Sequence, residues 1–356
     1  MEIVAVRGAL PPHRHAQAEI TEAFAGVIAR GGVDETLLRR LHANAGVDHR
    51  SLVLPITAYA ELEDFGQAND LFLEHAVTLG AQALEAALKA ADLTPSDVDQ
   101  LVCATVTGLA IPTLDARIMA VLGLRPDVRR VPMVGLGCVA GAAGIARLHD
   151  YLAGHPERVA ALVTVECCSL TVQREDTTMP NLVASGLFGD GAAAVVARGG
   201  TGHGGAVEVV DSRSRLYPDS ERTMGFDVSH RGLRIVLDAH VPAIVGRYIG
   251  EDVDGFLADQ GLCRADIGWW VCHPGGPKVI DALRDTLGLS DHDVALTRDS
   301  LSRIGNLSSA SVLHVLADTL RDRPPEPGSH GLLMAMGPGF CSELVLLRAT
   351  SAGAGR

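Results

Sequence analysis

The chain has 356 residues, of which 47% are hydrophobic and 21% are charged, and its formal net charge is -13 at pH 7. This length can bury a large core and hold two domains, whereas the acidic balance excludes nucleic acid as an expected partner and no apolar stretch is long enough to span a membrane. The seven cysteines are scattered without CxxC pairs, which argues against disulfides and zinc and predicts a reduced, cytoplasmic protein without a metal.

The N-terminal part of the sequence predicts strands alternating with helices. Residues 1–7 are typical of a short strand, and the apolar positions between residues 73 and 88 recur at spacings of three and four on one helix face. Residues 94–97 (TPSD) combine an N-cap, a proline at the first helical position and an acidic third position. The apolar run 101–108 then predicts a buried strand.

A cysteine follows the next predicted strand. Residues 131–134 are typical of a strand, and the Ala- and Gly-rich residues 139–148 predict a helix that packs deep inside the protein. Cys138 is therefore expected at the turn into the helix, where exposed N–H groups and the helix dipole favour a thiolate. On this segment alone a buried, inert cysteine is an equally good interpretation.

The second half of the sequence repeats the pattern of the first. Residues 263–268 form a short helical lead into the apolar strand 269–272, as residues 94–97 lead into the strand 101–108. Strands that alternate with helices predict an α/β fold, and a repeat predicts a duplicated domain with a pseudo-twofold axis.

A second pair of matching segments supports the duplication. Residues 188–191 (FGDG) precede an apolar strand, and residues 336–340 (MGPGF) precede another. The most Gly-rich stretch, residues 199–202, marks the expected join. We therefore predict an N-terminal half, residues 1–200, with the cysteine, and a C-terminal half, residues 201–356.

Two further polar residues lie beside glycine in the second half. His273 ends an apolar strand and precedes residues 274–277 (PGGP), and Asn306 lies between a glycine and a predicted helix, residues 308–318. Taken singly, the first is a loop histidine and the second an ordinary N-cap. Cys272 should point to the opposite side of the strand from His273, so a Cys–His metal pair is not expected.

Together, Cys138, His273 and Asn306 are the parts needed for thioester chemistry. A thiol can carry an acyl group, and an imidazole and a carboxamide can stabilise the negative charge that develops on a thioester oxygen. If the fold brings the three together, the chain is a carbon–carbon bond-forming acyltransferase with these three catalytic residues.

The segments around these residues resemble the type III polyketide synthases, the chalcone synthase-like branch of the thiolase-fold condensing enzymes, over nearly the whole chain. The nucleophile segment is residues 137–141 (GCVAG), the histidine segment residues 270–277 (WVCHPGGP) and the asparagine segment residues 305–311 (GNLSSAS). Residues 187–194 are similar to the segment with a gatekeeper phenylalanine, and residues 336–339 to the cyclisation-pocket loop. The related fatty-acid initiation synthases differ after the histidine, where they have a Gln-Ala-Asn run.

This resemblance implies a five-layered, duplicated α/β/α/β/α fold and a homodimer in which Ile111 reaches the partner's cavity. It also implies that Cys138 takes an acyl starter from coenzyme A while His273 holds it as a thiolate through an ion pair. His273 and Asn306 then bind the thioester oxygen of malonyl-CoA as it loses CO2, and the carbanion attacks the acyl-cysteine. Acyl-CoA and malonyl-CoA are substrates, and no cofactor is implied.

The resemblance also assigns a substrate pocket and CoA contacts. Phe188 is the expected gatekeeper between the CoA tunnel and the cavity, and Ile235 stands near the family's second gatekeeper phenylalanine, which should widen the passage. The other expected pocket residues are Cys168, Thr171, Ile111, Ser308, Gly337 and Pro338, and the expected CoA contacts are Arg50, Lys278, Gly275 and Gly276.

Three shorter segments resemble particular bacterial members of this family and bear on which acyl-CoA serves as the starter. Residues 65–70 (FGQAND), 166–172 (ECCSLTV) and 181–186 (NLVASG) look like those of bacterial alkylpyrone and alkylresorcinol synthases. With the small pocket residues Cys168 and Thr171, they predict a medium- to long-chain fatty acyl-CoA starter and an alkylpyrone or alkylresorcinol product.

Three alternatives remain open. One is a malonyl-primed tetrahydroxynaphthalene-type synthase or another 3-oxoacyl condensing enzyme. A degradative thiolase would need a second active-site cysteine, for which Cys341 is available. A catalytically inactive scaffold or ligand-binding protein is the third, and the intact cysteine, histidine and asparagine set argues against it.

Overall fold

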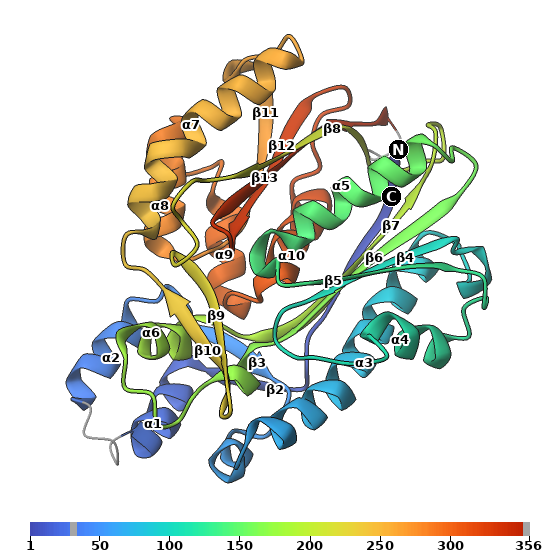
Figure 1. The fold of residues 1–356 in the computed structure, drawn as a ribbon. Coiled ribbons are helices and arrows are strands. Elements are labelled where there is room, and N and C mark those ends of the chain that lie inside the picture. Colours follow the sequence, from blue (N-terminus) through green and yellow to red (C-terminus); the bar gives the residue numbers. More distant parts are fainter. Residues whose placement is uncertain (29–33, 352–356) are drawn as a thin grey trace.

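The computed structural model describes residues 1–28 and 34–351. The strands of its main sheet are Glu2–Ala9 (β1), Gln100–Thr105 (β4), Arg129–Val134 (β5), Val159–Cys167 (β6), Asp190–Arg198 (β7), Val207–Leu216 (β8), Ile267–Cys272 (β11), His330–Gly337 (β12) and Cys341–Ala349 (β13). Within the described residues these strands form one nine-stranded sheet in the order β11-β12-β13-β8-β1-β7-β6-β4-β5 (Figure 1).

The remaining elements cover this sheet or lie beyond its end. Two small sheets pair His13–Ala16 (β2) with His49–Leu52 (β3), and Met224–Ser229 (β9) with Gly232–Leu237 (β10). The α-helices are Gln17–Ile28 (α1), Glu35–Ala43 (α2), Phe65–Ala90 (α3), Leu114–Leu122 (α4), Ala140–Ala153 (α5), Met179–Leu187 (α6), Val241–Asp259 (α7), Pro277–Leu287 (α8), Ala295–Ile304 (α9) and Ser311–Asp322 (α10). Short 3₁₀ helices are Ile56–Glu61 (η2), Pro95–Asp97 (η3), Gly137–Val139 (η4), Cys168–Thr171 (η5), Arg264–Asp266 (η6) and Ser308–Ala310 (η7).

The sheet contains the same strand pattern twice. In the first half β1 is antiparallel to β7, β7 is antiparallel to β6, and β6 is parallel to β4. In the second half β8 is antiparallel to β13, β13 is antiparallel to β12, and β12 is parallel to β11. The first half adds β5 as a parallel edge strand. Within the described main sheet, the two halves are joined where the ends of β1 and β8 pair, so the sheet has the duplicated architecture expected from the sequence.

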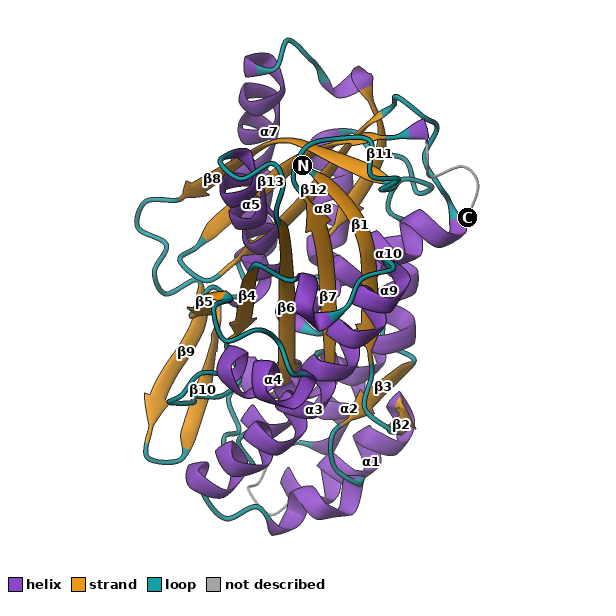
Figure 2. Cartoon of the chain, turned by 90° about the vertical axis from the view of Figure 1, so that its right-hand side faces the viewer, coloured by secondary structure: helices purple, strands orange, loops and turns teal. Residues whose placement is uncertain are grey.

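Helices complete the five layers of the predicted fold. Helix α3 packs against β1, β6 and β7, with α4 beside it, and Figure 2 shows both covering the outer face of the first half. Helices α5 and α10 lie between the two half-sheets, where the largest apolar cluster joins them to strands of both halves. Helices α7 and α8 pack on the outer face of the second half.

Two glycines let α5 lie in the central layer. A Cβ atom on Gly141 would lie 2.5 Å from the carbonyl oxygen of Ser309, and one on Gly144 would lie 2.4 Å from Leu162. Both distances are shorter than real Cβ contacts, so a larger residue at either position would push α5 away from its neighbours. The Ala- and Gly-rich composition of residues 139–148 therefore serves the deep packing that the sequence predicts.

The helices and strands predicted from short sequence motifs are present, and their ends differ from the predicted ends by a few residues. Thr94 and Asp97 form a capping box around η3, and the strand that follows is β4. The strand predicted to start at residue 192 begins at Asp190, within the gatekeeper segment 187–194. The helix predicted for residues 308–318 is the 3₁₀ turn η7 followed by α10, which extends to Asp322.

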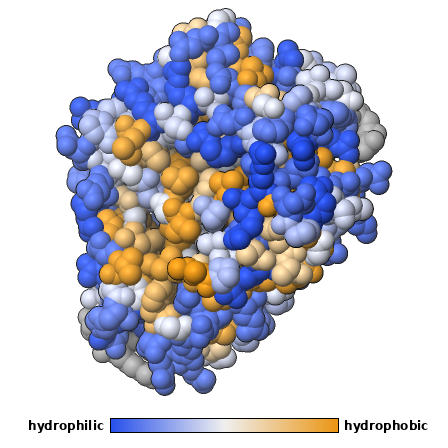
Figure 3. Space-filling view, turned by 45° about the vertical axis from the view of Figure 1, so that its right-hand side comes forward, coloured by the Kyte–Doolittle hydropathy of each residue, from blue (hydrophilic) through white to orange (hydrophobic). Residues whose placement is uncertain are grey.

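Several apolar side chains are exposed on the surface of this chain. They include Ile111, which is 97% exposed, together with Leu109, Val121 and Val134 from the loop before α4, α4 itself and the edge strand β5. Figure 3 shows apolar residues gathered in a band across one face of the molecule. Among the described residues no helix is long and apolar enough to cross a membrane.

Candidate active site

Cys138 lies at the turn that leads into the central helix α5. It is the middle residue of η4, and Gly137 before it has a φ of +55°, which an L side chain rarely adopts. A Cβ atom on Gly137 would also lie 2.9 Å from the ring of Pro338. The thiol is 6% exposed, and its Sγ donates to Oγ of Ser308 at 3.6 Å.

Asn306 is fixed by its own segment. Its Oδ1 accepts hydrogen bonds from the backbone N–H of Ser308 at 2.8 Å and from Oγ of Ser311 at 3.3 Å. These contacts occupy the carbonyl side of the amide, so the Nδ2 group is the donor that remains. The backbone of Asn306 pairs with that of Phe188 in an isolated parallel bridge, which places the two side chains at one wall.

His273 directly follows β11, and its backbone N–H donates to the carbonyl oxygen of Met334 at 2.9 Å. The imidazole is 5% exposed, and within the described part of the chain neither ring nitrogen has a hydrogen-bond partner. Burial lowers the pKa of this imidazole to about 3. Cys272 lies on the other side of the strand in the apolar cluster beneath α7 and α8, as the strand geometry predicts.

The fold brings the three predicted catalytic residues together although they come from three distant segments. Cys138, His273 and Asn306 line one pocket of about 530 Å³, with Phe188 and Gly275. The rest of its wall is apolar and consists of Leu187, Met224, Leu237, Val241, Val279, Leu283, Met334, Ala335, Met336 and Phe340. A thiol, an imidazole with free nitrogens and an amide donor therefore face a common space that is shielded from water.

Burial acts on both members of the ion pair expected between Cys138 and His273. Burial raises the pKa of the Cys138 thiol to about 12, partly offset by its hydrogen bond to Ser308. Among the described contacts no hydrogen bond joins this thiol to the imidazole, whose pKa burial lowers. Burial therefore disfavours the charged form of each group on its own.

A second pocket of about 610 Å³ adjoins the first and shares Cys138, Phe188, Met224 and Leu237 with it. Five positions assigned by resemblance line it, namely Cys168, Thr171, Ile235, Ser308 and Pro338. Phe188, the expected gatekeeper, lines both pockets together with Cys138, Met224 and Leu237. Gly337 lies behind the nucleophile instead, because a Cβ atom there would be 3.0 Å from the backbone nitrogen of Val139.

The β9–β10 hairpin forms one wall of the second pocket and was missed in the sequence. Across the hairpin Ile235 pairs with Phe226 and Leu237 pairs with Met224, and all four side chains line the pocket. The alternation of apolar and polar residues between 224 and 237 was the available signal.

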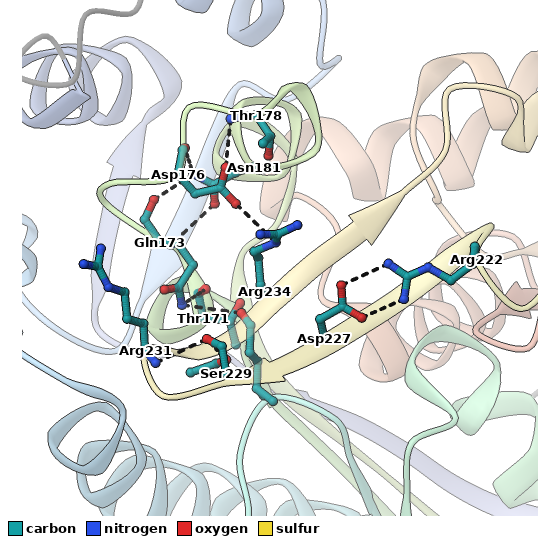
Figure 4. Close-up of polar contacts among 12 residues, drawn as sticks. Thr171, Gln173, Asp176, Thr178, Asn181, Arg222, Asp227, Ser229, Arg231 and Arg234 are labelled. Carbon is teal, nitrogen blue, oxygen red and sulfur yellow. Dashed lines mark hydrogen bonds and ion pairs between the residues drawn. The ribbon is translucent and has the colours of Figure 1, made fainter.

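Polar contacts fasten this hairpin to the segment between η5 and α6 (Figure 4). The Gln173 side chain donates to the carbonyl oxygens of Thr171 and Leu233, and Arg234 lies 4.0 Å from Asp176. Asn181 donates to the carbonyl oxygens of Gln173 and Asp176 and also lines the pocket. The wall that carries Ile235 is therefore tied to the wall that carries Thr171.

Glu166 is a further residue whose role the sequence did not indicate. It is fully buried, and its Oε1 accepts a hydrogen bond from Oγ of Ser309 at 2.5 Å. Its Oε2 accepts from Oγ1 of Thr107 at 2.9 Å and from the backbone N–H of Val106 at 3.1 Å. The carboxyl group thus connects the asparagine segment of the second half to two residues that line the second pocket.

The predicted CoA contacts have different positions. Lys278 is exposed in the first turn of α8, Gly276 precedes that helix, and Gly275 lines the first pocket. Arg50, in contrast, is 2% exposed, and its guanidinium donates to Oε1 of Gln17 and to the carbonyl oxygen of Phe188. This buried position is inconsistent with the predicted contact to CoA phosphates, because internal acceptors already bind the guanidinium.

Two other predicted positions lie outside both pockets. Ile111 projects from the loop before α4, far more exposed than any pocket residue. The thiol of Cys341 donates to the carbonyl oxygen of Pro338 at 3.1 Å and lines neither pocket, which argues against a second catalytic cysteine of the thiolase kind. No group of His, Cys, Asp and Glu side chains suited to a metal ion occurs among the residues that the structure describes.

Comparisons with known proteins agree with this geometry. Residues 2–201 match the family model for the N-terminal domain of chalcone and stilbene synthases, and residues 208–351 match the model for the C-terminal domain. The 1,3,6,8-tetrahydroxynaphthalene synthase of Streptomyces peucetius subsp. caesius is 54% identical over 349 residues, which cover 97% of this chain and 92% of the relative.

More distant relatives match over most of the chain. The 3,5-dihydroxyphenylacetyl-CoA synthase of Amycolatopsis orientalis is 36% identical over 321 residues, which cover 89% of this chain and 86% of that protein. The crystal structure of the 1,3,6,8-tetrahydroxynaphthalene synthase of Streptomyces coelicolor A3(2), a bacterial type III polyketide synthase, superposes with a TM-score of 0.92. It is 31% identical, and the match covers 99% of this chain and 100% of that chain.

Proposed function

The chain belongs to the chalcone and stilbene synthase family and is a type III polyketide synthase, and we propose that it builds 1,3,6,8-tetrahydroxynaphthalene from malonyl-CoA alone. The observation that carries this proposal is the 54% identity to a tetrahydroxynaphthalene synthase along nearly the whole chain. It favours the malonyl-primed alternative over the fatty acyl starter that the sequence analysis placed first.

Loading of the starter begins at Cys138. The thiol attacks the thioester carbonyl of malonyl-CoA, coenzyme A leaves as the thiol, and the acyl group stays on sulfur. His273 accepts the thiol proton during this step, since its two ring nitrogens have no other partner in the described structure. The attack needs a thiolate, which burial alone disfavours at Cys138, so the imidazole is essential for a reactive sulfur.

Decarboxylation of the next malonyl-CoA uses the donors that face the same pocket. Loss of CO2 leaves an enolate, whose oxygen accepts hydrogen bonds from the His273 imidazole and from Nδ2 of Asn306. The Asn306 carbonyl side is held by its own segment, so this donor does not reorganise when the charge develops. Removing one such donor typically costs about a hundred- to a thousandfold in rate. The carbanion then attacks the thioester carbonyl of the acyl-cysteine and forms the carbon–carbon bond. The bond to the Cys138 sulfur breaks, so the sulfur leaves as a thiolate and the extended chain is carried on coenzyme A.

Chain growth takes place in the second pocket. Its lining includes the hydroxyl groups of Thr107, Thr171 and Ser308 and the amide of Asn181. The Ser308 hydroxyl accepts from Cys138 and donates to no other group in the described contacts, so it can donate to a chain that carries a carbonyl at every second carbon, as one built only from malonyl units does. The donors of Thr107, Thr171 and Asn181 are already bound within the protein. The apolar remainder of the pocket excludes water. Every skeletal carbon of a naphthalene can come from such two-carbon units.

The test is a product analysis of the purified protein by mass spectrometry. With malonyl-CoA alone we expect the mass of tetrahydroxynaphthalene or of its oxidation product. A panel of fatty acyl-CoA starters added to malonyl-CoA should not raise total turnover. If turnover depends on a fatty acyl-CoA and rises with its chain length, the alkylpyrone or alkylresorcinol function predicted from sequence is correct and the naphthalene proposal is wrong.

A further inference from the structure

Buried polar side chains from the N-terminal segment converge on the end of α6, next to Phe188. Nε2 of Gln17 donates to the carbonyl oxygen of Gly186 at 2.7 Å, and Nε2 of His42 lies 3.0 Å from Oγ of Ser185. Nη1 of Arg50 donates to the carbonyl oxygen of Phe188 at 2.6 Å. The last carbonyl groups of a helix have no partner within it, so the N-terminal segment supplies the donors that end α6.

Arg50 extends this contact to the asparagine segment. A Cβ atom on Gly305 would lie 2.9 Å from Cγ of Arg50, and one on Gly189 would lie 3.6 Å from Cβ of Arg50. The two glycines flank Asn306 and Phe188 in the sequence. The aliphatic part of Arg50 therefore packs across both segments, while Nε is held by Oε1 of Gln17 at 3.1 Å.

Two backbone hydrogen bonds join the segment that carries Phe188 to the segment that carries Asn306. The N–H of Gly189 donates to the carbonyl oxygen of Asn306, and the N–H of Asn306 donates to the carbonyl oxygen of Leu187, both at 2.9 Å. A shift of Phe188 along its carbonyl direction therefore strains two hydrogen bonds of the asparagine segment. Arg50 is the only side chain of the described residues that hydrogen-bonds this bridge at the Phe188 carbonyl.

The Arg50 guanidinium loses hydration free energy when it is buried to donate to the Phe188 carbonyl oxygen. Within the described structure its Nη2 is buried without a hydrogen-bond partner, and no carboxylate pairs directly with the group. Asp190 is the nearby opposite charge, but its oxygens accept from Val53 and Ser169. Burying a charge without a direct partner costs stability, so the role of Arg50 lies in its contacts with Gln17 and Phe188 rather than in an ion pair.

We propose that Arg50 is a positioning residue that fixes the Phe188 gate and, through the Phe188–Asn306 bridge, the amide donor of Asn306. The inference rests on the proposed role of Asn306 in malonyl-CoA decarboxylation. It replaces the CoA contact expected from the sequence. Loss of Arg50 lets the bridge relax, so the donor no longer meets the enolate oxygen, whereas Cys138 keeps its place on α5.

The experiment compares malonyl-CoA decarboxylation, measured as acetyl-CoA formed, with alkylation of Cys138 by iodoacetamide. In Arg50→Met we expect kcat for decarboxylation to fall at least tenfold with an unchanged alkylation rate. Arg50→Lys, whose ammonium can reach the same carbonyl, should recover part of kcat. Thr21→Val is the matched control, because Thr21 lies in the same buried network 2.9 Å from His42 and does not touch Phe188.

If Arg50 only stabilises the fold, kcat and the melting temperature should change in a different way. Thr21→Val should lower the melting temperature and keep kcat, so equal loss of kcat in Thr21→Val and Arg50→Met at similar stability would overturn the proposal. If Arg50→Met does not fold, Arg50→Gln, whose side chain is too short to donate to the Phe188 carbonyl in the same way, takes its place, and wild-type kcat in that folded variant would overturn the proposal. Absence of a naphthalene product from the wild type would refute the proposed product only, since decarboxylation is measured separately.

Discussion

Cys138 and Ser308 make a direct side-chain contact between the two halves of the chain at the nucleophile. The thiol donates to Oγ of Ser308 at 3.6 Å, and Ser308 has a φ of 48°, in the left-handed region that few non-glycine residues occupy. The asparagine segment therefore bends so that its serine contacts the thiol while its amide donor lines the first pocket.

Replacing His273 with alanine should change the pH dependence of Cys138 alkylation. In the wild type the imidazole can accept the thiol proton, so iodoacetamide inactivation should already proceed at neutral pH. Without it, the thiol keeps the pKa that burial raises to about 12, and inactivation should be slow at pH 7 and rise steadily up to pH 10. Identical profiles in the two proteins would show that the helix N-terminus alone sets the reactivity of the sulfur.

Cys138 should be the only cysteine needed for acyl loading. Cys138→Ala removes the sulfur at the N-terminal end of α5, so covalent labelling by radioactive malonyl-CoA or acyl-CoA should disappear. Cys167→Ala and Cys341→Ala are suitable controls, because Cys167 is buried in the core of the first half and Cys341 lines neither pocket. Stoichiometric labelling of Cys138→Ala would refute the assignment of the nucleophile.

A tryptophan in place of Cys168 should stop chain growth early. Cys168 lines the second pocket and not the first, so the larger ring takes space from the growing chain and leaves the decarboxylation site intact. We expect acetyl-CoA formation to persist while the products shift from the aromatic compound to shorter pyrones, as seen by mass spectrometry. An unchanged product spectrum would mean that the chain grows elsewhere.

His42 should make stability depend on pH. Burial lowers the pKa of its imidazole from 6.5 to about 4, so between these values the unfolded chain binds a proton that the folded chain does not. The contribution of neutral His42 to the free energy of unfolding is fully present above pH 6.5 and is lost as the pH falls toward 4. The stability advantage of the wild type over His42→Gln should shrink by about 2 kcal/mol between pH 7.5 and pH 5, measured by urea unfolding. A constant advantage would contradict this prediction.

The exposed apolar side chains near α4 predict a homodimer. Ile111 is 97% exposed in the single chain and Val134, on the edge strand, is 55% exposed. Large side chains of this kind are rarely left in water together unless a partner covers them. Size-exclusion chromatography with light scattering should give twice the chain mass, and Ile111→Asp should shift the equilibrium toward the monomer. A wild-type monomer at micromolar concentration would refute the prediction.

The sequence by itself determined the features that depend on short-range signals. The capping box at Thr94 and Asp97, the turn that carries Cys138 and the apolar strands all follow from residue types within a few positions of one another. The nucleophile, histidine and asparagine segments indicated the family for the same reason, since each needs a fixed local backbone around one reactive side chain. Matching segments in the two halves also predicted the duplicated sheet.

Only the tertiary structure decided whether a polar side chain faces a ligand or binds another part of the protein. In sequence, an arginine suits a CoA phosphate or an internal carbonyl group equally well. In the structure Arg50 lies on β3 and is buried, where it donates to Gln17 of α1 and to the carbonyl oxygen of Phe188. The cavity wall formed by β9 and β10, and the buried Glu166 beneath the asparagine segment, depend on contacts between residues more than fifty positions apart. Whether a side chain is buried, and which group it hydrogen-bonds, depends on the packing of segments that are distant in sequence. Such packing excludes water only once the whole chain has folded.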